Sequence, residues 1–193
     1  CHILVFEDFG TIGLTGDPEE WERSDDDSNH FHSFFRAEGQ SGKGESDLGR
    51  WGIGKQVFVE ASSIRSIFGL TVRADDGKKL LMGMSVLRHH EVADVHHKPD
   101  GWMGHINESS SGPYVVPIED ESLIAPFESM FQLRRGNEPG LSLVIPYCPE
   151  DLSMDLLAEA ILANYLWPIM LGKLEVEIQT PEKLLVLNEV SLD

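Results

Sequence analysis

The sequence predicts an α+β fold, in which a two-layer sandwich places helices on one face of a mixed β-sheet. Apolar residues make up 41% of the 193 residues, enough for one domain with a core and an appendage. The apolar spacing changes along the chain between helical steps of three or four and the short runs typical of strands. The resulting order is strand, long connection, helix, hairpin, strand, helix and strands, which indicates helices packed against a sheet.

The first predicted strand is the apolar run His2–Phe6, which ends at two carboxylates. The glycine-rich segment Gly10–Gly16 follows and must turn, and Asp17–Asn29 is acidic without apolar periodicity. Ser33–Leu48 continues as a polar stretch. Together they form a connection of about 35 residues against a usual loop of about 4–6 residues, and long loops are typically lids or disordered segments. We therefore expect a lid over about residues 14–50.

A helix is predicted to start at Ile53 and to end at Gly69, because apolar residues recur between them at helical spacing. These residues are Ile53, Val57, Ala61, Ile64 and Phe68. The runs Phe68–Ala74 and Lys79–Arg88 then flank the segment Asp75–Lys78. An Asp-Gly pair between two apolar runs predicts a β-hairpin.

The histidine-rich stretch His89–Gly112 is predicted to be irregular, and Tyr114–Ile118 is a candidate strand. Leu123–Phe131 is predicted as a short helix, and Gly140–Tyr147 as a strand.

The last segment is predicted to hold a helix from Asp151 to about Met170. This helix is apolar on nearly all sides, so we expect it to be largely buried. Lys173–Gln179 alternates as a strand does, and Leu184–Leu187 is a last strand. The predicted division is therefore a domain over residues 1–147, followed by an extension or a second domain over residues 148–193.

The formal net charge of the chain is -18, with 15 basic and 33 acidic residues. Such a surface repels nucleic acid and anionic lipid, so neither is an expected partner. Cys1 and Cys148 show no paired spacing, which favours a reducing compartment and a cytoplasmic location. The apolar run Leu156–Leu171 is shorter than a membrane span and contains Glu159 and Pro168, so no membrane partner is expected.

Two stretches are candidates for holding a phosphate. Gly49–Lys55 nearly fits the P-loop pattern G-x-x-x-x-G-K-S/T, in which backbone N–H groups and the lysine bind phosphates. However, Gln56 replaces the hydroxyl residue that binds Mg²⁺, and the preceding segment Gly39–Leu48 is polar rather than a buried strand. These two features argue against a P-loop.

The second stretch, Glu7–Leu14, comes directly off the first strand. An aspartate such as Asp8 at a strand end can accept a hydrogen bond from the exocyclic amine of a purine. Gly10 and Gly13 would allow the base to approach closely. The glycines of the later stretch stand at the start of a helix, where N–H groups and the helix dipole favour phosphate.

This combination resembles the GHKL family of ATPases, which includes DNA gyrase B, MutL and the histidine kinases, and implies a Bergerat-like ATP-binding fold. The first glycine box of that family holds the adenine-binding aspartate, and the second caps the phosphate end of the lid. Gly140–Pro146 resembles a later strand that often begins Gly-Thr, with Leu141 in the threonine position. The resemblance covers roughly the first 90 residues best. The residues that it assigns to nucleotide binding are Asp8, Gly10, Gly13, Gly49, Arg50, Gly52, Gly54 and Lys55.

The sequence departs from the family in two ways. The second glycine of the first box comes one residue later than in the pattern D-x-G-x-G. The family's N-box helix, which carries the Asn that binds Mg²⁺ and the Glu that activates water, should precede the first box, whereas only Cys1 stands before the predicted strand. We therefore expect a fragment that binds ATP, takes its Mg²⁺ ligand from the missing helix, and has no catalytic residue of its own. An apolar sheet surface without its helix also predicts a homo-oligomer.

Other interpretations stay open. In one, the chain is a non-enzymatic protein-interaction domain whose glycine boxes are only turns. In another, His89–His97 (HHEVADVHH) forms the centre of a metal-dependent hydrolase. The H-E-x-x-H spacing is absent there, so a solvated loop is favoured and no metal ligand is assigned. The acidic run Asp25–Asp27 lacks the spacing of a calcium loop.

Overall fold

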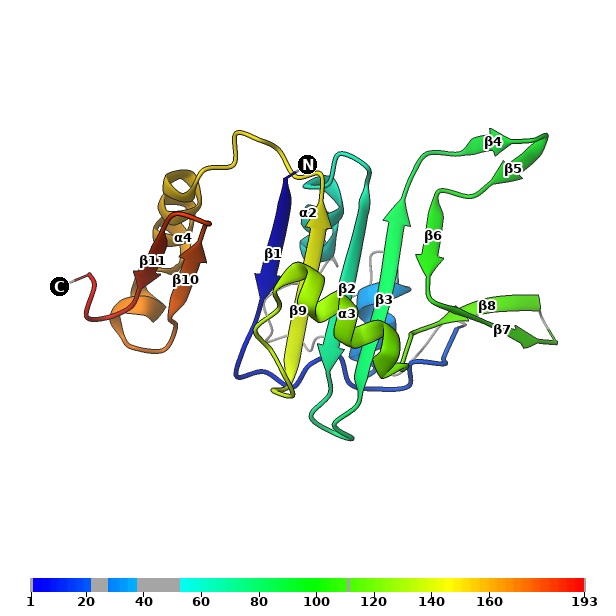
Figure 1. Cartoon of the computed structure of the whole chain (residues 1–193), viewed down its shortest axis with the longest axis horizontal. Helices are drawn as coiled ribbons and strands as arrows, with labels where there is room; N and C mark the ends of the chain where they lie inside the picture. The colour runs from blue at the N-terminus through cyan, green and yellow to red at the C-terminus, as the bar shows by residue number, and fades with distance from the viewer. Residues whose placement is uncertain (1, 22–27, 38–52, 111, 193) are drawn as a thin grey trace. The chain divides into compact units, whose positions relative to one another are not determined.

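A computed structural model describes residues 2–21, 28–37, 53–110 and 112–192 of the chain. It divides into two compact units, Cys1–Cys148 (unit 1) and Pro149–Asp193 (unit 2) (Figure 1). Among the described residues, no helix is long and apolar enough to cross a membrane.

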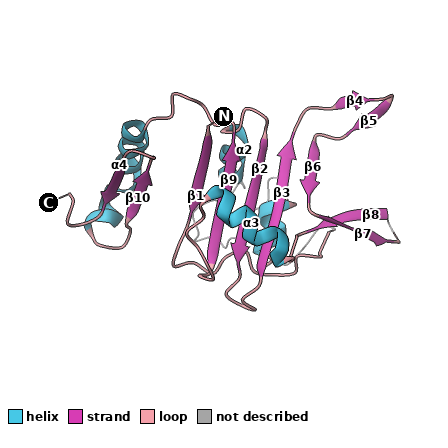
Figure 2. Cartoon of the chain, viewed as in Figure 1, coloured by secondary structure: helices cyan, strands magenta, loops and turns pink. Residues whose placement is uncertain are grey.

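Unit 1 is built on a five-stranded sheet with the strand order β1-β9-β2-β3-β6 (Figure 2). Every neighbouring pair in this sheet is antiparallel, so the prediction of a mixed sheet is wrong, while the α+β class is confirmed. The strands are β1 (Ile3–Glu7), β9 (Gly140–Pro146), β2 (Ser66–Val72), β3 (Lys79–Val86) and β6 (Asp100–Met103).

Helices cover both faces of this sheet. Helices α1 (His30–Phe35) and α2 (Ile53–Glu60) lie behind it in Figure 1, and α3 (Glu121–Phe131) lies in front. Leu80 packs in the core cluster that contains α1 and α2 residues, whereas its neighbour Leu81 packs with α3. Consecutive strand residues point to opposite faces, so the prediction of helices on one face is wrong.

Helix α1 was not predicted, because it is short and its surroundings are polar. Asn29 caps its first turn by accepting from the backbone N–H of His32 at 3.0 Å. Phe31 and Phe35 are 0% and 2% exposed, so the helix belongs to the core of unit 1. Helix α1 lies within the connection that the sequence predicts to be a lid, so part of that connection is buried in the core.

Helix α2 ends at Glu60, well before the predicted end at Gly69. Gly69 instead lies in the middle of β2, where a Cβ would come 2.9 Å from the Phe35 ring. Sheet pairing thus overrides the helical spacing that continues to Phe68. The predicted hairpin around Asp75–Lys78 is confirmed, since β2 and β3 pair across it.

The stretch His89–Gly112 is not irregular. It contains the ribbon of β4 (His90–Val92) with β5 (Val95–His97), then β6 and β7 (His105–Ser109). Strand β7 pairs with β8 (Gly112–Val116), close to the predicted strand. Short polar ribbons lack the apolar alternation on which the prediction depended.

Unit 2 packs helix α4 (Met154–Met170) against a ribbon of β10 (Val176–Gln179) and β11 (Leu184–Leu187). Its core centres on Ile169, which is 0% exposed. The expectation that α4 is largely buried is wrong, because one two-stranded ribbon covers only one stripe of a helix. Trp167, for example, is 71% exposed.

Candidate functional site

The candidate site lies at Asp8, directly after the last residue of β1. The backbone N–H of Asp8 donates to the carbonyl of Leu141 at 3.0 Å. The N–H of Leu141 in turn donates to Oδ1 of Asp8. The carboxylate therefore extends the pairing of β1 with β9 by one side chain, and 34% of that side chain remains exposed.

Arg135 lies beneath this carboxylate with a fully buried side chain. Its Nε donates to Oγ of Ser142 at 2.8 Å, and Nη2 donates to the carbonyls of Leu141 (2.7 Å) and Asp8. Nη2 also lies 3.4 Å from Oδ1 of Asp8, and the guanidinium is 4.9 Å from the centre of the Phe9 ring. Burial lowers the pKa of Arg135, and the nearby carboxylate of Asp8 opposes that shift. A buried cation thus compensates the charge of Asp8 and fixes its position.

The two carboxylates at the end of β1 are held differently. Glu7 uses both oxygens, accepting from Oγ of Ser142 at 2.7 Å and from the N–H of Arg134 at 3.0 Å. The contacts of the Asp8 carboxylate with Leu141 and Arg135 both use Oδ1. Asp8 is therefore the carboxylate better placed to accept a further donor.

The glycine loop after Asp8 packs against the sheet. Gly13 has φ +68°, and a Cβ there would overlap the carbonyl oxygen of Val72. The next N–H, of Leu14, donates to Oγ1 of Thr71 at 2.8 Å, and Thr71 donates to the carbonyl of Gly140 at 2.9 Å. Both the positive φ and the close approach of the Val72 carbonyl therefore require glycine at position 13.

Gly10 differs from Gly13. It has φ +72°, but a Cβ there would meet nothing within 4 Å. Backbone conformation alone favours glycine here, and the surface beside it is open.

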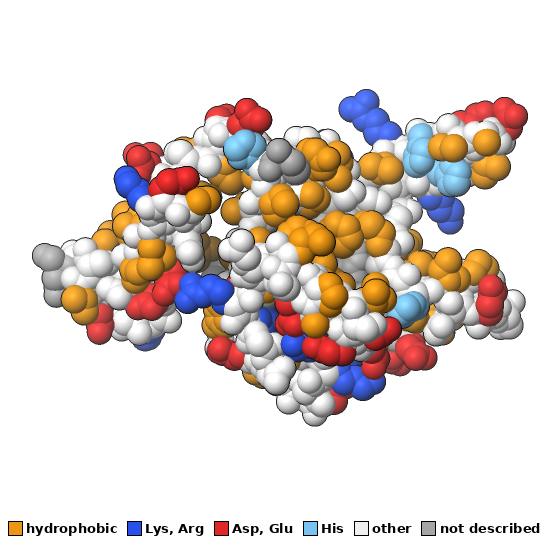
Figure 3. All heavy atoms as spheres, viewed as in Figure 1, with side chains coloured by type: hydrophobic (Ala, Val, Ile, Leu, Met, Phe, Trp, Pro, Cys, Tyr) orange, Lys and Arg blue, Asp and Glu red, His pale blue; other side chains and the backbone are white. Residues whose placement is uncertain are grey.

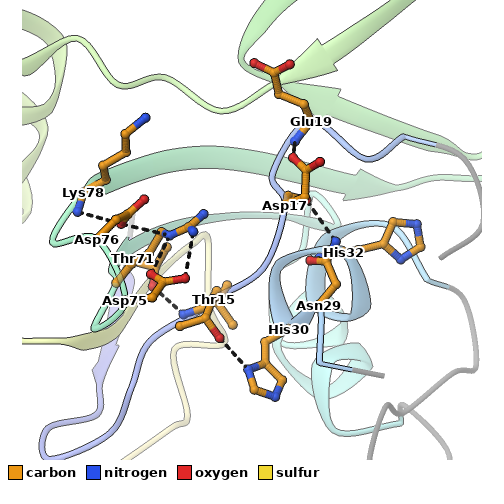
Figure 4. A network of polar contacts seen from close by, with 12 residues as sticks. Thr15, Asp17, Glu19, Asn29, His30, His32, Thr71, Asp75, Asp76 and Lys78 are labelled. Carbon is orange, nitrogen blue, oxygen red and sulfur yellow. Dashed lines mark hydrogen bonds and ion pairs between the residues drawn. The ribbon is translucent and has the colours of Figure 1, made fainter. Parts of the chain in front are cut away.

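The next segment is tied to α1. Figure 4 shows Asn29 reaching back to this segment, and its Nδ2 donates to the carbonyl of Asp17 at 3.0 Å. The Thr15 hydroxyl lies 2.9 Å from Nδ1 of His30. The glycine loop and the start of α1 therefore form one connected polar network.

The second predicted glycine box is only partly described. Gly49, Arg50 and Gly52 lie outside the described residues. Gly54 and Lys55 fall in the first turn of α2. Nζ of Lys55 donates to the carbonyls of Ser33 (3.2 Å) and Ala37, so it caps the end of α1. The structure thus brings Asp8, Gly10 and Gly13 together in one loop and places Lys55 at α1.

Two polar residues of the site were missed by the sequence analysis. Arg135 stands in a polar turn, and its sequence neighbours do not indicate that it is buried. Thr71 lies within a predicted strand, and nothing in the sequence distinguishes it from an ordinary core position. Both residues bond to β9 in the folded sheet, because Arg135 donates to Leu141 and Ser142 and Thr71 donates to Gly140.

The described residues contain no group of three or more His, Cys, Asp or Glu side chains that could hold a metal ion. Beside Asp8 lies the buried guanidinium of Arg135, a fixed cation that disfavours a Mg²⁺ ion at this carboxylate.

Comparisons with known proteins give no assignment. No family model matches the chain, and neither does any curated protein or solved structure.

Proposed function

We propose that unit 1 binds ATP in the manner of the GHKL ATPases, with Asp8 recognising adenine. The observation that supports this is the placement of the Asp8 carboxylate at the end of β1, anchored through Oδ1 by Leu141 and Arg135. Oδ2 would accept from the exocyclic amine of the base. Gly10, beside open surface, would allow the base to approach.

The phosphates would lie toward the second glycine box. Because the chain is strongly acidic, phosphate binding requires local cations, and Arg50 and Lys55 are the candidates in that box. Lys55 would exchange the carbonyls at the end of α1 for a phosphate oxygen. Nucleotide binding would thereby release a cap of α1 and shift the connection that carries it, acting on a partner or a dimer interface. Bound Mg²⁺ would shield the phosphate charge.

Calorimetry with ATP and ADP in the presence of Mg²⁺ tests this proposal. Asp8→Asn keeps an acceptor for Leu141 but replaces the charged acceptor of the base. A hydrogen bond to a charged group is worth about 1.5–3 kcal/mol, so we expect binding to weaken roughly 10- to 100-fold. Asp94→Asn is the matched control, because Asp94 has φ +63°, which asparagine tolerates, and lies in the β4–β5 turn.

Equal affinity of Asp8→Asn and the unmodified chain would refute the adenine site. If only a chain extended upstream binds ATP, the extension completes the site. If neither chain binds, the nucleotide proposal fails.

A second candidate function is protein interaction through unit 2. Helix α4 and its end expose several large apolar side chains within unit 2. They are Leu156, Tyr165, Leu166, Trp167, Met170 and Leu171. Sedimentation equilibrium of the chain and of Trp167→Ser tests whether this surface mediates the predicted self-association. The proposal expects a concentration-dependent dimer that the substitution weakens, and a monomer at all concentrations would refute it.

A further inference from the structure

We propose that the β4–β5 ribbon carries a divalent transition-metal site formed by the imidazoles of His90 and His97. The ribbon is a two-stranded hairpin that, among the described strands, pairs only with itself (Figure 1), and histidine side chains gather on it in Figure 3. Its site is separate from the nucleotide site proposed above and does not depend on it.

The turn of this ribbon fixes the register of the two histidines. Ala93 and Asp94 have φ +52° and +63°, which is the pattern of a two-residue type I′ turn. Val92 therefore pairs with Val95, and His90 pairs with His97. Residues directly opposite each other in antiparallel strands have Cβ atoms about 4.5–5.5 Å apart and share one face.

The two rings already lie together. The imidazoles of His90 and His97 stack with ring centres 5.3 Å apart and an interplanar angle of 16°. Two nitrogens on a tetrahedral Zn²⁺, each about 2.0–2.1 Å from the metal, lie roughly 3.3 Å apart. The lone pair of each ring nitrogen lies in the plane of its ring, so the two stacked side chains must rotate until both nitrogens face one ion. Both residues are exposed, so no packing opposes this rotation.

His90 is held in the tautomer that suits a metal ligand. Its Nδ1 lies 2.8 Å from the backbone carbonyl of Arg88. A carbonyl oxygen only accepts, so Nδ1 carries the proton and Nε2 keeps its lone pair. This arrangement, in which a ligand histidine donates its other N–H to a carbonyl, orients metal-binding histidines in proteins.

The environment of the pair favours an ion of intermediate softness. Imidazole suits Zn²⁺, Cu²⁺ and Ni²⁺, whereas Mg²⁺ and Ca²⁺ prefer oxygen. Val92 and Val95 lie on the same face beside the two rings. His96 and Glu91 form the next cross-strand pair, on the opposite face, where Nδ1 lies 3.4 Å from the carboxylate. Two protein ligands then bind the ion, and water fills its remaining positions.

Titration of the full chain with ZnCl₂, followed by calorimetry and by the imidazole ¹H–¹⁵N signals, tests the proposal. We expect the signals of His90 and His97 to shift together and to saturate with one equivalent. Because each ligand holds the ion near the other, His90→Gln or His97→Gln should weaken binding at least about tenfold. His96→Gln is the matched control, as it removes the same ring from the opposite face of the same ribbon, and should change affinity less than about twofold.

A shift confined to His2 or to other histidines would overturn the proposal. So would an equal loss of affinity in His96→Gln, or a titration that does not saturate. Circular dichroism of each variant would establish that these exposed substitutions leave the fold intact.

Discussion

Arg135 and Asp8 are joined at the end of β1, where Nη2 of Arg135 donates to the Asp8 carbonyl and lies 3.4 Å from its carboxylate. Because the guanidinium also bonds Ser142 and Leu141, one buried side chain fixes the end of β1 against β9. The position of the candidate adenine ligand therefore depends on a residue 127 positions away in the sequence.

Arg135→Met should lower the free energy of unfolding by about 3–5 kcal/mol, because removing one partner leaves buried polar groups unpaired. Urea unfolding followed by circular dichroism measures this loss. Arg65→Met is the control, since Arg65 pairs with Glu60 at the surface, with both side chains about half exposed, and should cost less than about 1 kcal/mol. Equal losses in the two variants would contradict the anchoring role.

Gly13→Ala should destabilise unit 1 more than Gly77→Ala. Both glycines have positive φ, +68° and +71°, so both substitutions carry the left-handed strain of about 1–2 kcal/mol. Only at Gly13 would the Cβ overlap a neighbouring carbonyl, that of Val72. The difference between the two unfolding free energies therefore isolates the packing of the glycine loop, and a difference of zero would show that the loop moves freely.

The ionised Asp75 carboxylate should add to the free energy of unfolding at neutral pH, and this contribution should disappear in acid. The hydrogen bond from Arg73 holds the pKa of Asp75 below its ordinary value of 3.8 in the folded chain. A carboxyl whose folded pKa is lowered stabilises the fold above its unfolded pKa, and this contribution is lost as pH falls through the folded pKa. Because 43% of the Asp75 side chain is exposed, the effect should stay below about 1 kcal/mol.

Unfolding of Asp75→Asn and of the unmodified chain at a series of pH values checks this prediction. The difference in stability should be constant from neutral pH down to about pH 5 and should shrink below pH 3.8. Asp94→Asn provides the comparison in the same unit. A difference that grows on acidification would reverse the predicted sign.

Ile169→Ala should destabilise unit 2 by about 2–5 kcal/mol, because Ile169 is fully buried in its core. Hydrogen exchange should then lose protection in α4, β10 and β11. Leu156→Ala, on an α4 side chain that is 52% exposed, is the control and should leave exchange nearly unchanged. Protection in β2 and β3 should persist, and its loss in Ile169→Ala would show that the two units unfold together.

Much of the element order was predictable, because apolar spacing is a local property. The hairpin at Asp75–Lys78, the strand at Gly140–Pro146 and the strand Leu184–Leu187 all follow from their own residues. The antiparallel sheet and the placement of α3 were not predictable, since the sequence does not state which strands become neighbours. Phe68 shows the limit, because it continues a helical pattern yet pairs with Val144 inside the sheet.

Only the part of the candidate site that directly follows β1 was predictable from the sequence. Asp8 and Gly13 can be identified from the sequence because they follow an apolar run. Arg135 does not, because the burial of a charged residue depends on acceptors that come from Leu141 and Ser142 in three dimensions. The pairing of His90 with His97 was likewise hidden, since the two positive-φ turn residues are alanine and aspartate rather than glycine.

The position of β9 between β1 and β2 sets the order in which unit 1 can assemble during synthesis. Among the described strands, β1 pairs with β9 alone, from Ile3 with Pro146 to Glu7 with Ser142. The hairpin of β2 and β3 can form as soon as it leaves the ribosome, whereas β1 must wait until Pro146 has emerged. Asp8, which follows β1, is thus among the last residues of unit 1 to reach its native position, and a nascent chain that stops before Gly140 carries an unpaired strand open to aggregation.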